Sequence, residues 1–457
     1  MYTYQDFISD STNSGLTKAV ESVLNGYWAS TLYKTAVDAD EYDAQRNTTI
    51  MQFMKVLYTA KGQPYIDLTS ANNKITSNFF ARLNTQRKTY SLGNGVFFKE
   101  ESTKLRFEDD FDRKVQKAGY AALIHGVSYI FLNLNRLDIF KATEFAPLWN
   151  EETGELMAGV RWWRIDAKKP LMVELYEPDG VTKLKKDKDG ELVITAEKQP
   201  YKLNVQTMAA EEGIDIISGE NWDGALPIIP CYGSRLKQST LVGMKAQIDS
   251  YDLIRSGFAD DLTDCSEIYW IINGAGASTE ADLERFRNRL KTTHMASMVD
   301  EEVTATPYTQ EIPYAARQTY LDSIRAGIYE AYGGLDVHTI AAGATNDHID
   351  AAYQPVDEQA DDYEECISDA ICALLKLMGI DDAPTFKRNR ISNEREQVDM
   401  VISCADYLDE ETVLRKLPFI DEEDIEGILD RKTEEMAARY SVTEPVEDGQ
   451  GEGNADE

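Results

Sequence analysis

The residues of this chain that could do chemistry are densest in one short stretch, DVHTIAAGATNDHID, at positions 336–350. Histidine and aspartate are metal ligands and acid–base catalysts, so the stretch raises the question of a metal or catalytic site. His338 and His348 are ten residues apart, and this separation matches no zinc-ligand spacing such as HExxH. The spacing therefore gives little support to a metal site, and a polar loop between two predicted helices is the alternative.

Carboxylates are the second group from which a site could be built. They cluster as EDDFD at 108–112, ADD at 259–261 and DEED at 421–424. Acid–base catalysis by two carboxylates requires that they lie in different environments in one pocket. A strongly acidic chain produces such clusters by chance, and solvated faces explain them. A carboxylate-based hydrolase is therefore kept as an alternative function.

Motifs that bind nucleotides or metals are missing from the sequence. There is no GxxxxGK[ST] phosphate loop, and NGAGAS at 273–278 lacks the rest of a dinucleotide fingerprint. The five cysteines are scattered and include no CxxC pair, which is typical of buried apolar residues. His125, in an apolar stretch, and His294, at a predicted helix end, are interpreted as structural histidines. We predict no cofactor, no metal and no enzymatic activity.

The net charge of the chain limits which partners it can bind. The formal net charge is −33, and 19 acidic but only five basic side chains lie between Asp399 and Glu457. Affinity for phosphate depends on clustered lysine and arginine, so the charge argues against a basic surface that binds nucleic acid tightly. It does not exclude nucleic acid as a passing partner. MYTYQDFISD has no signal-peptide pattern, and AALIHGVSYIFL is too short to span a membrane. We expect a soluble protein, made and used in a cytoplasm, without a membrane partner.

The spacing of apolar residues predicts an α+β chain. Residues 1–237 open with helical spacing and continue, from about 126 to 205, as short alternating runs joined by Pro, Asp and Gly, a pattern typical of an antiparallel sheet. Farther along, a helix over 354–384 carries a stripe typical of a core. Helical segments at 385–441, broken at KLPFID, and an acidic tail at 442–457 that we expect to be disordered complete the chain.

Two long helices, at 238–262 and 314–332, bracket a small αβ insertion at 263–313. Their apolar residues recur at spacings of three and four and form one narrow stripe on each helix. These residues are Leu241, Met244, Ile248, Tyr251, Phe258, Leu321, Ile324 and Ile328. The second helix is predicted to end at the Gly333-Gly334 pair. Such stripes need neighbouring elements to cover them, and no partner for the two helices is evident elsewhere in the chain.

The order of these features resembles the portal proteins of tailed bacteriophages, more specifically the siphophage portal family. The phrases that carry the resemblance are collinear over about residues 20–440. They are YSLGNGV, GYAALIHGVSYIFLNLN, VELYEPDGVTKL, ALPIIP, LVGMKAQIDSYDLIRSGFADDL and DEETVLRKLPFIDEEDIEGILDRKTEE. One departure lies in the loop, where relatives often carry a Ser-Gly pair and this chain reads ATNDHID.

The resemblance implies a portal-type fold with named parts. These are an α-rich wing with an antiparallel sheet at 1–237, stem helices at 238–262 and 314–332, a small αβ clip at 263–313, a tunnel loop at 333–353, a further wing helix at 354–384 and a helical crown at 385–441. Gly333, Gly334 and Gly343 would give the tunnel loop freedom to move.

The function implied by the resemblance is a ring, typically of twelve subunits, at one capsid vertex. Double-stranded DNA would pass through its channel during packaging and ejection. The implied partners are the terminase large subunit, the head–tail adaptor, and the major capsid and scaffolding proteins. The protein would belong to the virion, and to the host cytoplasm during assembly.

Particular residues follow from the same resemblance. The DNA-channel loop would contain His338, Thr339, Gly343, Asn346, Asp347 and His348, and the clip would meet its partners through Glu280, Asp282, Glu284 and Arg285. An excess of carboxylate along the channel would repel phosphate, so that DNA slides. Another head–tail connector or capsid component is the nearest alternative, and a clip-type insertion between two long helices argues against it.

Overall fold

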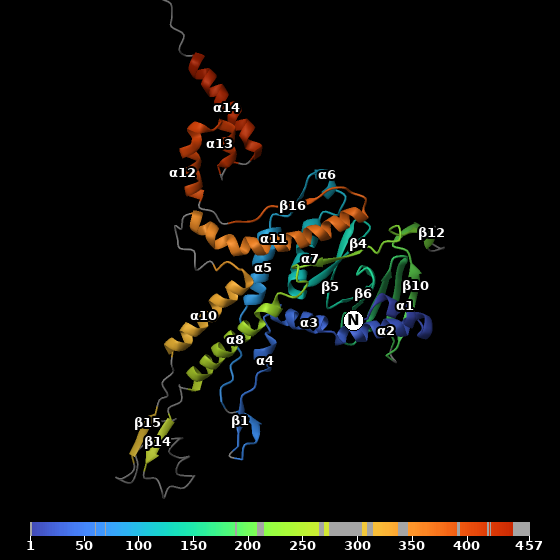
Figure 1. Ribbon diagram of the computed structural model, residues 1–457, viewed down its shortest axis with the longest axis vertical. Coiled ribbons are helices and arrows are strands. Elements are labelled where there is room, and N and C mark those ends of the chain that lie inside the picture. Colours follow the sequence, from blue (N-terminus) through green and yellow to red (C-terminus); the bar gives the residue numbers. More distant parts are fainter. Residues whose placement is uncertain are drawn as a thin grey trace, which may run out of the picture. The chain divides into compact units, whose positions relative to one another are not determined.

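The computed structural model describes residues 2–59, 61–68, 70–187, 190–207, 214–264, 269–273, 304–308, 314–336, 346–390, 394–417, 420 and 422–441. Two compact units are present (Figure 1). The first combines Met1–Gly334 with Pro355–Asn389, and the second combines Leu335–Gln354 with Arg390–Glu457. The described residues form helices and antiparallel sheets, which confirms the predicted α+β class.

The first unit opens with four helices: α1 (Tyr4–Ser14), α2 (Leu16–Ala29), α3 (Thr31–Asp43) and α4 (Thr48–Gln52). Thr3 and Asp6 form a capping box at the start of α1, which satisfies backbone N–H groups that a helix leaves without partners. Ser30 caps α3 by accepting a hydrogen bond from the backbone N–H of Tyr33. Short polar residues thus divide this α-rich opening into separate helices.

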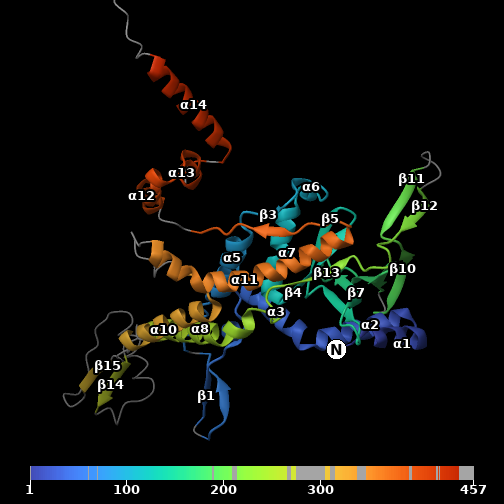
Figure 2. The same ribbon diagram turned by 45° about the horizontal axis from the view of Figure 1, so that its top comes forward.

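A five-stranded antiparallel sheet packs against these helices. Its order is β10-β9-β8-β7-β6, and every strand pairs with its neighbour along the chain. The strands are β6 (Phe145–Trp149), β7 (Leu156–Trp163), β8 (Met172–Glu177), β9 (Gly180–Lys186) and β10 (Leu192–Gln199). One face of the sheet presents Val160, Val173 and Leu184 to Val20 and Leu24 of α2, and all five side chains are buried. Figure 2 shows α1 and α2 beside this sheet.

A three-stranded sheet with the order β13-β4-β5 lies at the centre of the same unit. Its strands are β4 (Val127–Asn133), β5 (Arg136–Lys141) and β13 (Ile228–Tyr232), and the surrounding helices are α5 (Phe79–Leu92), α7 (Phe111–His125) and α11 (Asn346–Leu377). Tyr363, Ile367, Ile371 and Leu374 of α11 pack on α7 and the strands. The core stripe predicted for this helix is therefore confirmed.

Short elements close the first unit. They are α6 (Glu101–Lys104) and the paired strands β3 (Val96–Phe98) with β16 (Pro384–Phe386), β11 (Lys202–Thr207) with β12 (Ile214–Glu220), and β1 (Val56–Tyr58) with β2 (Pro64–Ile66). The pairing of β16 with β3 places residues 385–389 in the first unit. The helical segment predicted to begin at 385 therefore begins after Asn389, because backbone pairing holds the preceding residues to β3.

Two long helices, α8 (Leu241–Asp264) and α10 (Tyr314–Tyr332), bracket the insertion as predicted. The start of α8 lies three residues after the predicted start, where the Ser239 side chain accepts a hydrogen bond from the Leu241 N–H at 3.1 Å. Within the insertion, β14 (Tyr269–Asn273) pairs with β15 (Thr304–Tyr308), and residues 274–303 lie outside the described part of the chain.

The loop predicted at 333–353 is shorter than expected, because α11 already begins at Asn346. The buried stripe of α11 starts at Ile349 and Tyr353, one helical turn apart, and continues to Val356 and Ala360. Pro355 lies inside this helix, and a proline at that place in a sequence is typical of a helix start. The border between the two compact units falls between Gln354 and Pro355.

The second unit contains α12 (Glu394–Cys404), a short 3-10 helix (Ala405–Tyr407), α13 (Glu410–Lys416) and α14 (Glu422–Ser441). Asp409 caps α13 by accepting a hydrogen bond from the Thr412 N–H at 3.0 Å. The break between α13 and α14 coincides with the predicted break at KLPFID. The tail at 442–457 lies outside the described residues. Across the described residues of both units, no helix has the length and apolar content of a membrane span.

Candidate functional site

The α8–α10 pair is built on the predicted apolar stripe. Leu241, Met244 and Ile248 of α8 and Ile328 of α10 are buried in one cluster, and Tyr251 and Ile324 pack against it. The same cluster contains Phe79, Phe80 and Leu83 of α5 and Tyr42 of α3. The expectation that no partner for this stripe exists within the chain is therefore wrong. Aromatic side chains from the first 90 residues cover it, a long-range contact that spacing along the helices does not reveal.

The far ends of the two helices meet through Phe258 and Tyr314, whose ring centroids are 5.5 Å apart. Leu321, farther along α10, is 7 % exposed. The eight stripe residues therefore lie at or near contacts inside one subunit. Neighbouring copies would have to contact other faces of these helices.

The end of α10 is fixed rather than free. Gly333 has a φ of +66°, and the N–H groups of Gly333 and Gly334 donate to the carbonyls of Glu330 and Tyr329, which together form a Schellman motif. A Cβ atom on Gly334 would lie 2.6 Å from Leu83 Cδ2. Arg87 donates to the Tyr332 carbonyl at 2.7 Å and adds positive charge to the helix C-terminus. These two glycines serve a tight helix end, and the freedom of movement expected of them does not follow.

A second face of α8 carries polar residues one turn apart, Asp252, Ser256 and Asp260, and each is buried. We call these three residues the polar ladder. They accept hydrogen bonds from the backbone N–H groups of Ser77 at 3.0 Å, Ile75 at 3.0 Å and Asn73 at 2.6 Å, respectively. Four residues of helix rise about 6 Å, and two residues of extended chain span nearly the same length. The extended segment 73–77 thus runs antiparallel to α8 in register with it.

The two carboxylates of the polar ladder differ electrostatically. Burial raises the pKa of Asp252 above its usual value, although hydrogen bonds from Asn47 and Ser77 oppose the shift. Burial acts in the same direction on Asp260, but the Asn73 hydrogen bonds and the Lys55 ammonium outweigh it and lower the pKa. Lys55 Nζ lies 3.0 Å from Asp260 Oδ2. One end of the ladder is therefore ion-paired, whereas the other end is held by neutral donors.

A polar cluster extends the same attachment toward the start of α8. Lys245 Nζ lies 2.9 Å from both Tyr42 Oη and Thr49 Oγ1 and 3.0 Å from Asp249 Oδ2. Burial acts to lower the pKa of Lys245, but its bonds to Tyr42 and Asp249 outweigh burial and raise it. These contacts join α8 to α3 and α4.

The residues of the predicted DNA-channel loop are only partly described. His338, Thr339 and Gly343 lie outside the described residues, and Asn346 begins α11. Asp347 and His348 are exposed in the first turn of this helix, where a carboxylate is favourable beside the helix N-terminus. Among the residues that the structure describes, no three His, Cys, Asp or Glu side chains are grouped as metal ligands.

The predicted clip contacts, Glu280, Asp282, Glu284 and Arg285, also lie outside the described residues, as does His294. His125 is described and buried. Its Nε2 lies 2.9 Å from Asp40 Oδ1. Burial acts to raise the pKa of Asp40, but His125 and Lys141 outweigh it and lower the pKa. This histidine joins α7 to α3, as expected of a structural residue.

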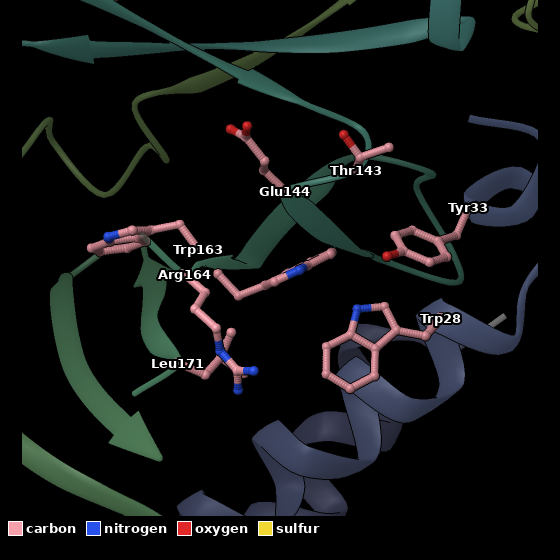
Figure 3. A pocket seen from close by; sticks show the side chains of 8 residues that line it. Trp28, Tyr33, Thr143, Glu144, Trp163, Arg164 and Leu171 are labelled. Atoms are coloured by element: carbon pink, nitrogen blue, oxygen red, sulfur yellow. The ribbon is translucent and has the colours of Figure 1, made fainter. Parts of the chain in front are cut away.

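One pocket of about 480 Å³ lies between the first helices and the five-stranded sheet (Figure 3). It is lined by Trp28, Tyr33, Thr143, Glu144, Trp162, Trp163, Arg164 and Leu171. Glu144 is the one carboxylate among these residues, so the pair of carboxylates that a hydrolase requires is not present in this pocket. The lining combines four aromatic side chains with one charged residue of each sign, Glu144 and Arg164.

The carboxylate clusters singled out in the sequence have structural partners where they are described. Asp112 accepts a hydrogen bond from the Val96 N–H at 3.1 Å, and Asp110 lies 2.8 Å from Arg113. Asp261 pairs with Arg317 of α10. The sequence analysis did not identify the polar ladder. Polar residues at 252, 256 and 260, spaced by one helical turn, were the signal that could have predicted it.

Comparison with known proteins decides the family. The family described as phage portal protein, SPP1 Gp6-like, matches residues 34–438. The chain belongs to this family. Two portal proteins are among its relatives. That of Clostridium phage phiCD119 is 22 % identical over 386 residues, which cover 78 % of this chain and 83 % of the relative. That of Bacillus phage SPP1 is 25 % identical over 416 residues, which cover 84 % and 80 %.

Two chains from solved structures of a gene transfer agent particle resemble this chain more distantly. One, from the virion of the native particle, has a TM-score of 0.43 and 13 % identity and covers 73 % of this chain and 88 % of its own. The other, from the neck computed with C12 symmetry, has a TM-score of 0.40 and 10 % identity and covers 74 % and 89 %. Family membership assigns the function of a phage portal protein, a structural role, and confirms the prediction that the chain is not an enzyme.

Proposed function

We propose that about a dozen copies of this chain form a ring at one capsid vertex, and that double-stranded DNA crosses the axial channel of this ring during packaging and ejection. Membership of the portal family over residues 34–438 carries the proposal. In this assignment the protein is a virion component that assembles in the host cytoplasm.

The α8–α10 pair would form the stem of each subunit. A channel that transmits force needs rigid walls, and this pair is held by two independent sets of contacts. The apolar stripe joins α8 to α10 and α5, and the polar ladder joins α8 to segment 73–77. Residues 263–313 between the two helices would form the clip that meets the terminase large subunit and the head–tail adaptor, with Glu280, Asp282, Glu284 and Arg285 among its contacts.

The other parts of the portal fold are assigned by their order along the chain. Residues 1–237 and the helix in 354–384 would form the wing, which faces the major capsid and scaffolding proteins, and 385–441 would form the crown. The segment 333–353 would be the tunnel loop. Asp347 and His348, exposed in the first turn of α11, would lie beside passing DNA together with His338, Thr339, Gly343 and Asn346.

The charge of the chain suits a channel through which DNA slides. A ring of twelve chains of charge −33 would carry on the order of −400 formal charges. Carboxylates along a channel repel phosphate, and tight binding to the wall would require clustered lysine and arginine. The ring should therefore hold DNA weakly at all salt concentrations, and a strongly basic channel wall would contradict this part of the proposal.

Electron microscopy of the purified full-length protein tests the ring, together with its mass in solution. We expect end-on class averages with about a dozen subunits around a hole wide enough for a duplex, and a mass near twelve times the 51.5 kDa of one chain. Recombinant rings with one subunit more or fewer would still support the proposal. A compact monomer or dimer at every salt concentration would overturn it.

A further inference from the structure

The β1–β2 hairpin exposes apolar side chains on both faces. All six strand residues are exposed, and their pairing aligns Val56 with Ile66 and Leu57 with Tyr65. Nine of the 26 large apolar side chains that are exposed in the described residues lie between positions 51 and 68. They are Met51, Phe53, Met54, Val56, Leu57, Tyr58, Tyr65, Ile66 and Leu68. We call residues 51–68 the hairpin arm.

Such a density of exposed apolar groups needs an explanation. Single exposed apolar residues are ordinary on protein surfaces, but a contiguous apolar patch marks an interaction surface. A two-stranded hairpin without a cover is also barely stable in water by itself. The hairpin arm therefore has the properties of a surface that another molecule covers.

The base of the hairpin arm is held firmly. Before it, Asn47 donates to Asp252 on α8, and inside it Lys55 forms the ion pair with Asp260. After it, the N–H groups of residues 73, 75 and 77 bind the polar ladder. Figures 1 and 2 show the hairpin, labelled β1, projecting beyond α4. A firmly held base limits the conformational entropy lost when the arm binds.

We propose that the hairpin arm packs on the outer face of the α8–α10 pair of a second copy of this chain. The inference rests on the proposed ring. In a ring formed head to tail, each copy offers one surface and receives the same surface of its neighbour at a different place. A projecting arm therefore requires a receiving surface on the same chain.

The outer face of the α8–α10 pair fits that requirement. Leu262 near the end of α8 and Tyr314 and Tyr320 near the start of α10 are 51–61 % exposed, although most of the stripe between the two helices is buried. Between the two tyrosines, α10 exposes the small residues Ala315, Ala316 and Thr319, so the surface has room for a hairpin. This face thus offers apolar contacts that its own subunit leaves open to solvent.

The arm and the receiving face are also on different sides of α8. At 100° per residue, the polar ladder lies about 100° around the helix from the stripe that faces α10. The base of the arm is therefore attached away from α10. This separation suits contacts that pass from one copy to the next around a ring.

The first test compares two triple variants of the full-length protein. The hairpin variant carries Leu57→Ser, Tyr58→Ser and Ile66→Ser. The matched control carries Leu105→Ser, Ile165→Ser and Leu236→Ser, which replace three apolar residues that are 75–87 % exposed elsewhere in the first unit. Native mass spectrometry and microscopy should show that the hairpin variant needs at least tenfold more protein to form rings, with the control unchanged. Circular dichroism checks that both variants fold.

A second test reports the contact itself. Protein with Tyr58→Cys is mixed with differently tagged protein carrying Tyr320→Cys, and a short bis-maleimide is added. We expect a covalent dimer containing both tags, and much less of it when Leu105→Cys replaces Tyr58→Cys. Equal yields from both mixtures would overturn the proposed contact, because they would show that the native cysteines or random encounters account for the product.

The outcomes separate this inference from the proposed function. A wild type that never assembles overturns both. A wild type that forms rings while the hairpin variant does so equally well overturns the inference and leaves the ring standing. Rings of the hairpin variant that fail to enter capsids would assign the arm to a capsid protein, and this too would overturn the contact between copies.

Discussion

The five-stranded sheet and the hairpin arm use the same kinds of residue and place them in opposite environments. In the sheet, Val160, Leu175 and Leu184 are fully buried. In the hairpin, Val56, Leu57 and Tyr58 are 42–69 % exposed. Both are antiparallel strands of β-branched, aliphatic and aromatic residues, for which strand propensity is similar. Propensity thus explains why both regions form strands, and it does not explain which of them is covered.

The difference lies in what the chain supplies to cover each region. The helix α2 presents its buried stripe to the sheet, so this core is complete within one subunit. The hairpin has a polar attachment at its base and an apolar surface beyond it. The sheet therefore stabilises the subunit, whereas the hairpin is available for assembly. Four predictions test this division.

The largest effect is expected from Phe145→Ala in β6. Phe145 is fully buried, and its ring centroid lies 4.5 Å from that of Tyr129 and 5.8 Å from that of Phe140. Removing a buried aromatic ring costs about 3–5 kcal/mol through lost burial and a residual cavity. Urea unfolding followed by circular dichroism measures the loss. Phe145 packs between the five-stranded sheet and the strands β4 and β5, so a loss below 1 kcal/mol would show that this second core does not hold the sheet.

A somewhat smaller effect is expected from Gly159→Ala in β7. The added Cβ atom would lie 2.0 Å from Phe145 Cζ, so the ring would have to move. Overpacking of this kind costs about 1–3 kcal/mol. In the Phe145→Ala background the obstruction is absent, so the same change should cost much less. Equal costs in both backgrounds, measured by urea unfolding, would mean that the alanine acts on the backbone and not on the ring.

The attachment of the hairpin should respond to pH, in opposite directions at its two ends. Asp252 has a raised pKa in the folded protein, so folding gains stability as pH falls from the folded value toward the ordinary value of 3.8. Any stability advantage of Asp252→Asn over the wild type should therefore be largest at pH 7 and shrink toward pH 4.

Asp260 has a lowered pKa, and its contribution is present above 3.8 and lost as pH falls through the folded value. Asp260→Asn should cost about 1 kcal/mol at pH 7, since a charge-assisted hydrogen bond becomes a neutral one, and the cost should disappear at low pH. Unfolding curves of both variants from pH 3 to 7 measure the two trends. Parallel trends would contradict the electrostatic difference between the two ends.

The smallest effect on subunit stability is expected in the hairpin arm. Tyr58→Ser should change the free energy of unfolding by less than about 0.5 kcal/mol, because exposed residues without partners contribute little. The measurement uses protein dilute enough to be monomeric. A loss of 2 kcal/mol or more would mean that the hairpin is covered within its own subunit, and the contrast with the sheet would fail.

Much of the secondary structure could be predicted because its causes are local. The turn residues between the strands of the central region, the end of α10 at Gly333-Gly334 and the helix break at KLPFID each depend on a few neighbouring residues. The start of α11 was not predicted, because its buried stripe begins at Ile349, before Pro355, within residues assigned to the loop. The loop residues before Asn346 and the clip residues stay predictions.

The sequence by itself determined the acidic charge, the absence of catalytic motifs, the apolar stripes of α8, α10 and α11, and the order of features that led to the family. Tertiary structure alone decided that α5 covers the stripe of α8, that Asp260 meets Asn73, 187 positions away, and that the hairpin stays uncovered. The physical reason is range. Helix periods, caps and turns follow from backbone geometry over a few residues, whereas the partner of a side chain depends on the path of the whole chain.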